Sequence, residues 1–148
     1  MPRPKKERIV HEPPRFVRFK PAGVRCQTGE MLTLSLDEYE AIRLADHQGL
    51  DHAQASQEME ISRSTFTRLI EKARKKLATL IVEGREVIIE GGNIHFRGNL
   101  VKCMNCGLMF KTSFENKINK CPSCESENLL DLAGGFGHGR CCGHRNNS

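Results

Sequence analysis

Apolar residues recur at helical spacing in three consecutive segments in the middle of the chain. The first segment begins at Ser35, which forms a capping-box pattern with Glu38 three residues later, and it ends at Gly49, a typical helix stop. The second segment begins at Asp51, with Gln54 in the same relation to it. The pattern therefore predicts two short helices ahead of a third.

The third segment is the longest of the three. Ser62 is a good N-cap residue, and an apolar stripe follows it as far as Gly84. The stripe consists of Phe66, Leu69, Ile70, Ala73, Leu77, Leu80 and Ile81. At about 100° per residue, the opposite face consists of Ser64, Arg68, Glu71 and Lys75. This polar face is the one that we expect to meet a partner.

Two short helices followed by a longer one, with short turns between them, are typical of a helix-turn-helix. Such a unit reads DNA by placing the N-terminal end of its last helix against base edges, while cations around that helix meet phosphates. We predict base-edge contacts from Arg63, Ser64, Thr67 and Arg68. We predict phosphate contacts from Lys72, Arg74, Lys75 and Lys76. Glu71 also lies on the polar face, and the alternative to a partner contact there is an ion pair with Lys75 on the helix surface.

Several motifs in this region resemble known families. The stretches 38–46, 61–66 and 73–77 resemble the promoter-reading helix-turn-helix of region 4 in sigma factors. More closely, 1–4, 19–23, the predicted helix-turn-helix and 90–92 together resemble the bacterial and archaeal family known as domain of unknown function 134. The resemblance implies DNA binding and gives no target. Glu60 departs from the pattern, because such turns often carry Gly, which takes positive φ without steric cost.

The distribution of charge supports a polyanion as the partner. The chain has 148 residues and a net charge of +5, but residues 1–25 carry +6 and residues 62–78 carry +5, so the remainder is acidic. Two basic segments on an otherwise acidic chain are typical of a focused binding surface for nucleic acid. Solvated charge that maintains solubility is the alternative for both segments.

Proline, glycine and cysteine mark the boundaries of four regions. Residues 1–34 form a basic arm that contains five of the six prolines, and the alternation in 15–20 predicts a short strand. The helix-turn-helix domain occupies 35–92 and ends in a short strand at 87–89, a zinc ribbon occupies 93–132, and a flexible Gly/Cys/His-rich tail occupies 133–148. We therefore expect a mainly α fold: a sigma region 4-like helix-turn-helix of the winged-helix-type superfamily, plus a small β zinc ribbon.

Two Cys-x-x-Cys pairs predict a metal site in the third region. Cys103 and Cys106 are separated by fourteen residues from Cys121 and Cys124, so each pair can form a knuckle and four thiolates can complete a zinc tetrahedron. Iron is the alternative metal. Because four protein ligands leave no open position for water, Lewis-acid catalysis is not expected. We find no catalytic motif elsewhere and expect a protein that is not an enzyme.

The tail offers a second set of metal ligands. His138, Cys141, Cys142 and His144 are enough for one ion, but a disordered tail with exposed cysteines is the favoured alternative, because no apolar framework would hold the ligands. His95 is assigned no role. If the tail does bind metal, the rival function is a metal or redox sensor or carrier.

We expect a transcriptional regulator that acts on double-stranded DNA. RNA polymerase or another protein is a candidate partner of the ribbon. A homodimer is a candidate assembly, because one such helix covers only a half-site. The absence of a long apolar run or a signal peptide favours the cytoplasm and excludes a membrane partner.

Overall fold

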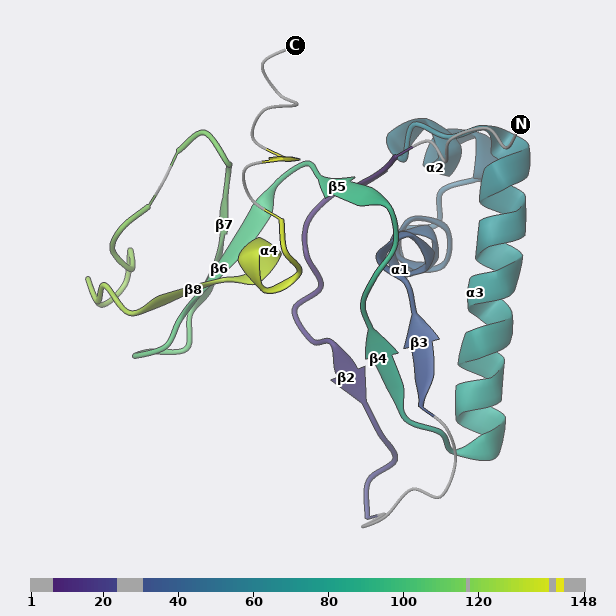
Figure 1. Ribbon diagram of the computed structural model, residues 1–148, viewed down its shortest axis with the longest axis horizontal. Coiled ribbons are helices and arrows are strands. Elements are labelled where there is room, and N and C mark those ends of the chain that lie inside the picture. The colour runs from purple at the N-terminus through teal and green to yellow at the C-terminus, as the bar shows by residue number, and fades with distance from the viewer. Residues whose placement is uncertain (1–6, 24–30, 117, 139–140, 143–148) are drawn as a thin grey trace. The chain divides into compact units, whose positions relative to one another are not determined.

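The computed structural model describes residues 7–23, 31–116, 118–138 and 141–142. The chain divides into two compact units (Figure 1). The first comprises Met1–Ile9 with Phe16–Ile94, and the second comprises Val10–Arg15 with His95–Ser148. No helix of the described residues is long and apolar enough to cross a membrane.

Helices make up most of the first unit. They are α1 (Leu36–Ile42), the π-helical turn η1 (Arg43–His47), α2 (His52–Glu58) and α3 (Arg63–Glu83). Both predicted capping boxes are present, because Ser35 accepts the amide of Glu38 and Asp51 accepts the amide of Gln54. The first helix differs from the prediction at its end, where the α-helix changes to the wider π turn of η1.

The boundaries of α3 follow the predicted signals. The hydroxyl of Ser62 accepts the amide of Thr65, which satisfies one of the free amides of the first turn. Gly84 ends the helix in the left-handed conformation, with φ 63°. The third predicted helix, from Ser62 to Gly84, is therefore confirmed.

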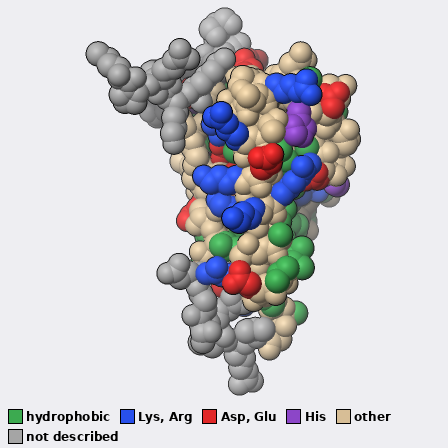
Figure 2. Space-filling model, turned by 90° about the vertical axis from the view of Figure 1, so that its right-hand side faces the viewer, with side chains coloured by type: hydrophobic (Ala, Val, Ile, Leu, Met, Phe, Trp, Pro, Cys, Tyr) green, Lys and Arg blue, Asp and Glu red, His purple; other side chains and the backbone are tan. Residues whose placement is uncertain are grey.

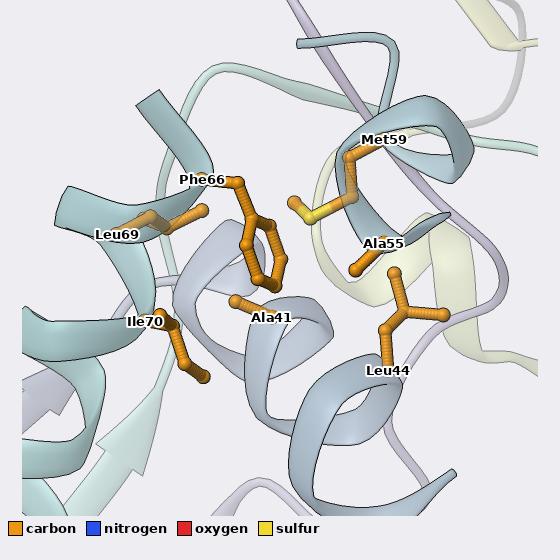
Figure 3. Packing of buried hydrophobic residues seen from close by; sticks show 7 residues of the cluster. All are labelled: Ala41, Leu44, Ala55, Met59, Phe66, Leu69 and Ile70. Carbon is orange, nitrogen blue, oxygen red and sulfur yellow. The ribbon is translucent and has the colours of Figure 1, made fainter. Parts of the chain in front are cut away.

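The helices α1, α2 and α3 pack around one apolar cluster, with the ring of Phe66 in its middle (Figure 3). The cluster consists of Ala41, Leu44, Ala55, Met59, Phe66, Leu69 and Ile70. Burying a Phe side chain of this kind stabilises the fold by about 1.5–3 kcal/mol. The second half of the α3 stripe lies outside this core. Ile81 is 76% exposed, and its neighbour Val82 is 83% exposed.

The turn between α2 and α3 contains a strained residue. Glu60 has φ 56°, in the left-handed region that costs a non-glycine residue about 1–2 kcal/mol. Its amide donates to the carbonyl of Gln57, and the amide of Ile61 donates to the carbonyl of Ser56. The turn is thus closed tightly, and the position where Gly is common in such turns does require positive φ here.

A three-stranded sheet accompanies the helices of the first unit. Its strands are β2 (Arg18–Phe19), β4 (Val87–Ile89) and β3 (Leu32–Leu34), in the order β2-β4-β3. β4 pairs parallel with β3 and antiparallel with β2. Figure 1 shows β3 and β4 running beside α3. The predicted strand at 87–89 is confirmed, whereas the strand predicted for 15–20 is reduced to two residues.

Sheets also form the second unit. Its strands β6 (Asn99–Cys103), β7 (Met109–Thr112) and β8 (Leu129–Asp131) pair antiparallel in the order β7-β6-β8, and the short helix α4 (Leu132–Gly135) follows β8. Apart from the sheets of the two units, β1 (Arg8–Val10) and β5 (Ile94–Phe96) form a two-stranded sheet.

The expectation of a mainly α fold is wrong. About 37% of the described structure is helical and 21% is in strands, which lie in three small sheets. The missed strands β1 and β3 are only three residues long, too short for a period-two pattern, and both lie in the proline-containing segment that the sequence suggested to be an arm. They are held by pairing with β5 and β4, which are distant in sequence.

Candidate functional site

Four cysteines meet at one end of the β7-β6-β8 sheet. Cys103 ends β6, and the thiols of Cys106, Cys121 and Cys124 lie with it within 4.8 Å of one another. The Sγ–Sγ distance is 3.5 Å between Cys103 and Cys124, and 3.6 Å between Cys106 and Cys121. Thiolates at the corners of a tetrahedron with Zn–S bonds of about 2.3 Å lie about 3.8 Å apart, so the cluster could hold a metal ion.

The two knuckles have the same backbone geometry. In the first, the amide of Cys103 donates to the carbonyl of Leu108, and the amide of Gly107 donates back to the carbonyl of Cys103. In the second, the amide of Cys121 donates to Ser126 and that of Glu125 donates back to Cys121. The fifth residue has positive φ in both, 81° at Gly107 and 61° at Glu125. The repeated turn explains how both pairs present their thiols to one point.

Backbone amides stabilise two of the thiolates. The amide of Cys106 donates to Sγ of Cys103 and lowers the pKa of that thiol to about 6. The amide of Cys124 lowers the pKa of Cys121 in the same way. At Cys106 the amide of Leu108 also lowers the pKa, but burial and the three neighbouring thiols outweigh it and raise the pKa to about 12. A divalent cation bound to the four sulfurs would displace the remaining thiol protons and ionise the whole set.

The tail residues are partly brought together. His138, Cys141 and Cys142 lie within 4.8 Å of one another, as their predicted common role requires, and the fourth group in the cluster is His95. The predicted ligand His144 lies outside the described residues. Burial lowers the pKa of His138, and the neighbouring charge of His95 lowers it further, which favours the neutral ring.

The predicted DNA-contacting residues all lie on α3, but their surroundings differ. Thr67 and Lys76 are half-buried, and the other six are exposed. These six are Arg63, Ser64, Arg68, Lys72, Arg74 and Lys75. The hydroxyl of Thr67 donates to the carbonyl of Arg63 and lies 2.9 Å from Nδ1 of His52, so it ties α3 to α2.

Two of the predicted phosphate contacts form ion pairs within the first unit. Arg74 donates twice to the carboxylate of Asp46, at 2.7 and 3.1 Å, and these bonds lower the pKa of Asp46. Lys76 lies 2.6 Å from the buried carboxylate of Glu38 and donates to the carbonyl of Thr33 at 2.8 Å. Both cations therefore have structural partners that their sequence positions did not suggest.

A hollow of about 550 Å³ lies between α3 and the start of α1. Its lining includes four cations and two carboxylates, namely Arg8, Arg68, Lys72, Lys76, Asp37 and Glu38. Arg8 pairs with Asp37, and Lys76 pairs with Glu38. Arg68 and Lys72 have no ion pair among the described residues, so the hollow has an excess of positive charge.

The family model described as "Protein of unknown function DUF134" matches residues 1–97. The chain belongs to this family. A UPF0251 protein of Chloroherpeton thalassium is 46% identical, over 95% of this chain and 95% of its own length. UPF0251 proteins of Chlorobaculum tepidum and Methanothermobacter thermautotrophicus are 39% and 38% identical, over 95% and 94% of this chain and 74% and 77% of their own lengths. No solved structure matches.

The DUF134 match covers α1, α2, α3 and β5 but ends before the first of the four clustered cysteines. It includes His95, the one clustered residue that the sequence analysis left without a role. The other ligands of its cluster are distant from His95 in the sequence, and 47 positions separate it from Cys142. Only the fold brings these two residues together, so no spacing rule could have found the pair.

Proposed function

We propose that this protein is a transcriptional regulator that binds double-stranded DNA through α3. One observation carries the proposal: Arg63, Arg68, Lys72 and Lys75 are exposed, and no ion pair among the described residues involves them. Figure 2 shows lysine and arginine side chains gathered on the side of the molecule that α3 occupies. Exposed cations on a helix that follows a tight turn are suited to the phosphates and base edges of a major groove.

The structure supports a division of roles along α3. Arg63, Ser64 and Arg68 belong to its first two turns, where a recognition helix contacts base edges. Lys72 and Lys75 follow within the next two turns and meet the phosphate backbone. Arg68 and Lys72 also border the positively charged hollow, so the contact surface extends from α3 toward the start of α1. Thr67 positions the helix through its hydrogen bond to His52 of α2.

The four-cysteine cluster serves this function as a structural element. We propose zinc as its ion, because four thiolates in a closed tetrahedron are typical of structural zinc. Such a site has no open coordination position, which favours a protein that is not an enzyme. The β7-β6-β8 sheet is then a docking module for RNA polymerase or another protein. Thiolate ligands persist in a reducing compartment, so we place the protein in the cytoplasm.

Salt-dependent DNA binding tests the proposal. With two phosphate contacts, from Lys72 and Lys75, the log-log slope should be near −1.8, so that affinity falls about 12-fold between 50 and 200 mM salt. The measurement is fluorescence anisotropy of a labelled duplex mixed with zinc-loaded full-length protein. No binding at 50 mM salt would refute the proposal.

Two substitutions on α3 separate sequence reading from phosphate contact. Lys75→Ala should weaken binding to all duplexes and reduce the slope by about one unit, whereas the charge-conserving Lys75→Arg should leave the slope unchanged. Arg68→Ala should relax sequence preference among genomic fragments selected by binding, at a cost of about 1–3 kcal/mol on the preferred site. If neither Lys75→Ala nor Arg68→Ala alters binding, α3 is not the DNA-contacting element.

A further inference from the structure

A second cluster of metal-ligating side chains lies in the second unit. His95 on β5 and His138, Cys141 and Cys142 near the C-terminus place their ligand atoms within 4.8 Å of one another. We propose that these four residues form a second metal site, which binds a thiophilic divalent ion such as Zn²⁺ independently of the four-cysteine cluster.

The distances within this cluster match a tetrahedral site. The two thiols of Cys141 and Cys142 are 3.8 Å apart, and Nδ1 of His138 lies 3.2 and 3.6 Å from them. Nδ1 of His95 lies 3.8 Å from Sγ of Cys142. Around a zinc ion with Zn–S of about 2.3 Å and Zn–N of about 2.05 Å, the expected separations are about 3.8 Å between sulfurs and about 3.6 Å between sulfur and nitrogen.

A folded framework holds these ligands. The side chain of Asp131 caps α4, and the amide of His138 donates to the carbonyl of the buried Ala133 at 3.0 Å. Phe96 contacts this segment twice, through its ring against that of Phe136 at 6.0 Å and against the His138 ring at 5.2 Å. The expectation of a disordered tail with exposed cysteines rested on the lack of an apolar framework, and Phe96 with α4 supplies one.

A backbone amide also stabilises the sulfur of Cys142 in the form that binds metal. The amide of Phe96 donates to Sγ of Cys142 at 3.2 Å, and the Cys142 side chain is buried. An N–H donor aimed at sulfur stabilises the thiolate over the thiol. The neighbouring residue of Phe96 on β5 is His95, so one strand both donates to the thiolate and supplies an imidazole.

The donor set defines the class of ion. Two thiolates and two neutral imidazoles in a tetrahedron favour Zn²⁺, and binding releases the protons of the two thiols to solvent. Oxygen-preferring cations such as Mg²⁺ and Ca²⁺ find no carboxylate or carbonyl ligand in this set. Because Cys141 is exposed while Cys142 is buried, one ligand remains open to exchange with solvent thiols or chelators.

The experiment compares two histidine substitutions in the full chain. Purified wild-type, His95→Ala and His144→Ala proteins are loaded with Zn²⁺, desalted and analysed for metal per chain by mass spectrometry. We expect His95→Ala to lose one equivalent relative to the wild type and His144→Ala to lose none. The result is the difference in metal content per chain between each variant and the wild type. It therefore does not depend on the metal occupancy of the four-cysteine cluster or on DNA binding.

Two outcomes would overturn the proposal. If His95→Ala retains all the metal of the wild type, these four residues do not form a site. If His144→Ala loses one equivalent and His95→Ala loses none, the C-terminal segment binds metal without β5. Cys142→Ser gives a second measurement: titration of the apoprotein with Co²⁺ should show weaker thiolate-to-metal absorption than in the wild type, whereas unchanged absorption argues against the site. Far-ultraviolet circular dichroism checks that each variant keeps its secondary structure.

Discussion

Two lysines one helical turn apart on α3 should respond to substitution in opposite ways. Lys76 pairs with Glu38, whose side chain is only 4% exposed, whereas Lys72 is exposed and has no ion pair among the described residues. Lys76→Met removes the cation but keeps the aliphatic length of the side chain. Lys72→Met makes the same chemical change at a position where we infer a phosphate contact, so it is the matched control.

The size of the effect follows from the burial of Glu38. Removing one partner of a fully buried ion pair costs about 3–5 kcal/mol, because the other charge stays buried. The side chain of Lys76 is 28% exposed, so solvent screens part of the interaction and we expect about 2–3 kcal/mol. Lys72→Met should change the free energy of unfolding by less than about 0.5 kcal/mol.

The double variant Lys76→Met with Glu38→Gln tests the cause of the loss. Gln keeps the acceptor that the capping box needs, since Oε1 of Glu38 accepts the amide of Ser35 at 3.0 Å, but it carries no charge. Most of the lost stability should therefore return. If the double variant is as unstable as Lys76→Met, the loss comes from packing and the ion-pair reasoning is wrong.

Urea unfolding followed by tyrosine fluorescence is a suitable assay. The chain has one tyrosine and no tryptophan, and Tyr39 lies on α1 next to Glu38, so its signal reports on the first unit. The same variants are then titrated with DNA. Lys72→Met should reduce the salt slope by about 0.9 and Lys76→Met should leave it unchanged. If Lys76→Met is as stable as the wild type and reduces the salt slope, Lys76 contacts phosphate and the assignment of a structural ion pair to it is wrong.

Three further predictions concern the turn, an ion pair and the cysteine cluster. Glu60→Gly should raise the free energy of unfolding by up to about 1 kcal/mol, because φ 56° is free of steric cost for glycine, while Glu60→Val should lower it; urea unfolding measures both. Asp46→Asn should cost less than about 1 kcal/mol at neutral pH, because its pair with Arg74 is about half exposed. Hydrogen bonds from Arg74 hold the pKa of Asp46 below its usual value in the fold, so this stabilisation is present above the unfolded pKa and should disappear as the pH falls through the folded pKa; an equal loss at every pH would contradict it. Cys121→Ser should remove the metal of the four-cysteine cluster and the circular dichroism of the β7-β6-β8 sheet together, and a sheet that persists without metal would refute the structural role.

The features that sequence predicted well are local ones. A capping box is complete within four residues, so Ser35 with Glu38 and Asp51 with Gln54 marked two helix starts without any knowledge of the rest of the fold. The spacing of Cys-x-x-Cys is local in the same sense. Even the doubtful turn residue was visible, since Glu60 occupies a position that requires positive φ.

The features that sequence missed depend on contacts between distant segments. Strand β3 is three residues long and exists because it pairs in parallel with β4, more than fifty positions later. His95 joins the second cluster in the same way, through a fold that returns the C-terminal segment to β5. No pattern within a short window of sequence carries this information, because each of these elements is stabilised by contacts with a segment that is distant in the sequence.

The basic segment of α3 shows why the partners of each charge matter for function. The sequence predicted phosphate contacts from four cations of this segment, but two of them, Arg74 and Lys76, neutralise Asp46 and Glu38 within the first unit. Two cations, Lys72 and Lys75, then remain for phosphates, and this difference is measurable. Four contacts would weaken binding about 150-fold between 50 and 200 mM salt, against about 12-fold for two. A slope near the lower value would mean that tertiary structure, and not the net charge of the helix, sets the strength of the DNA contact.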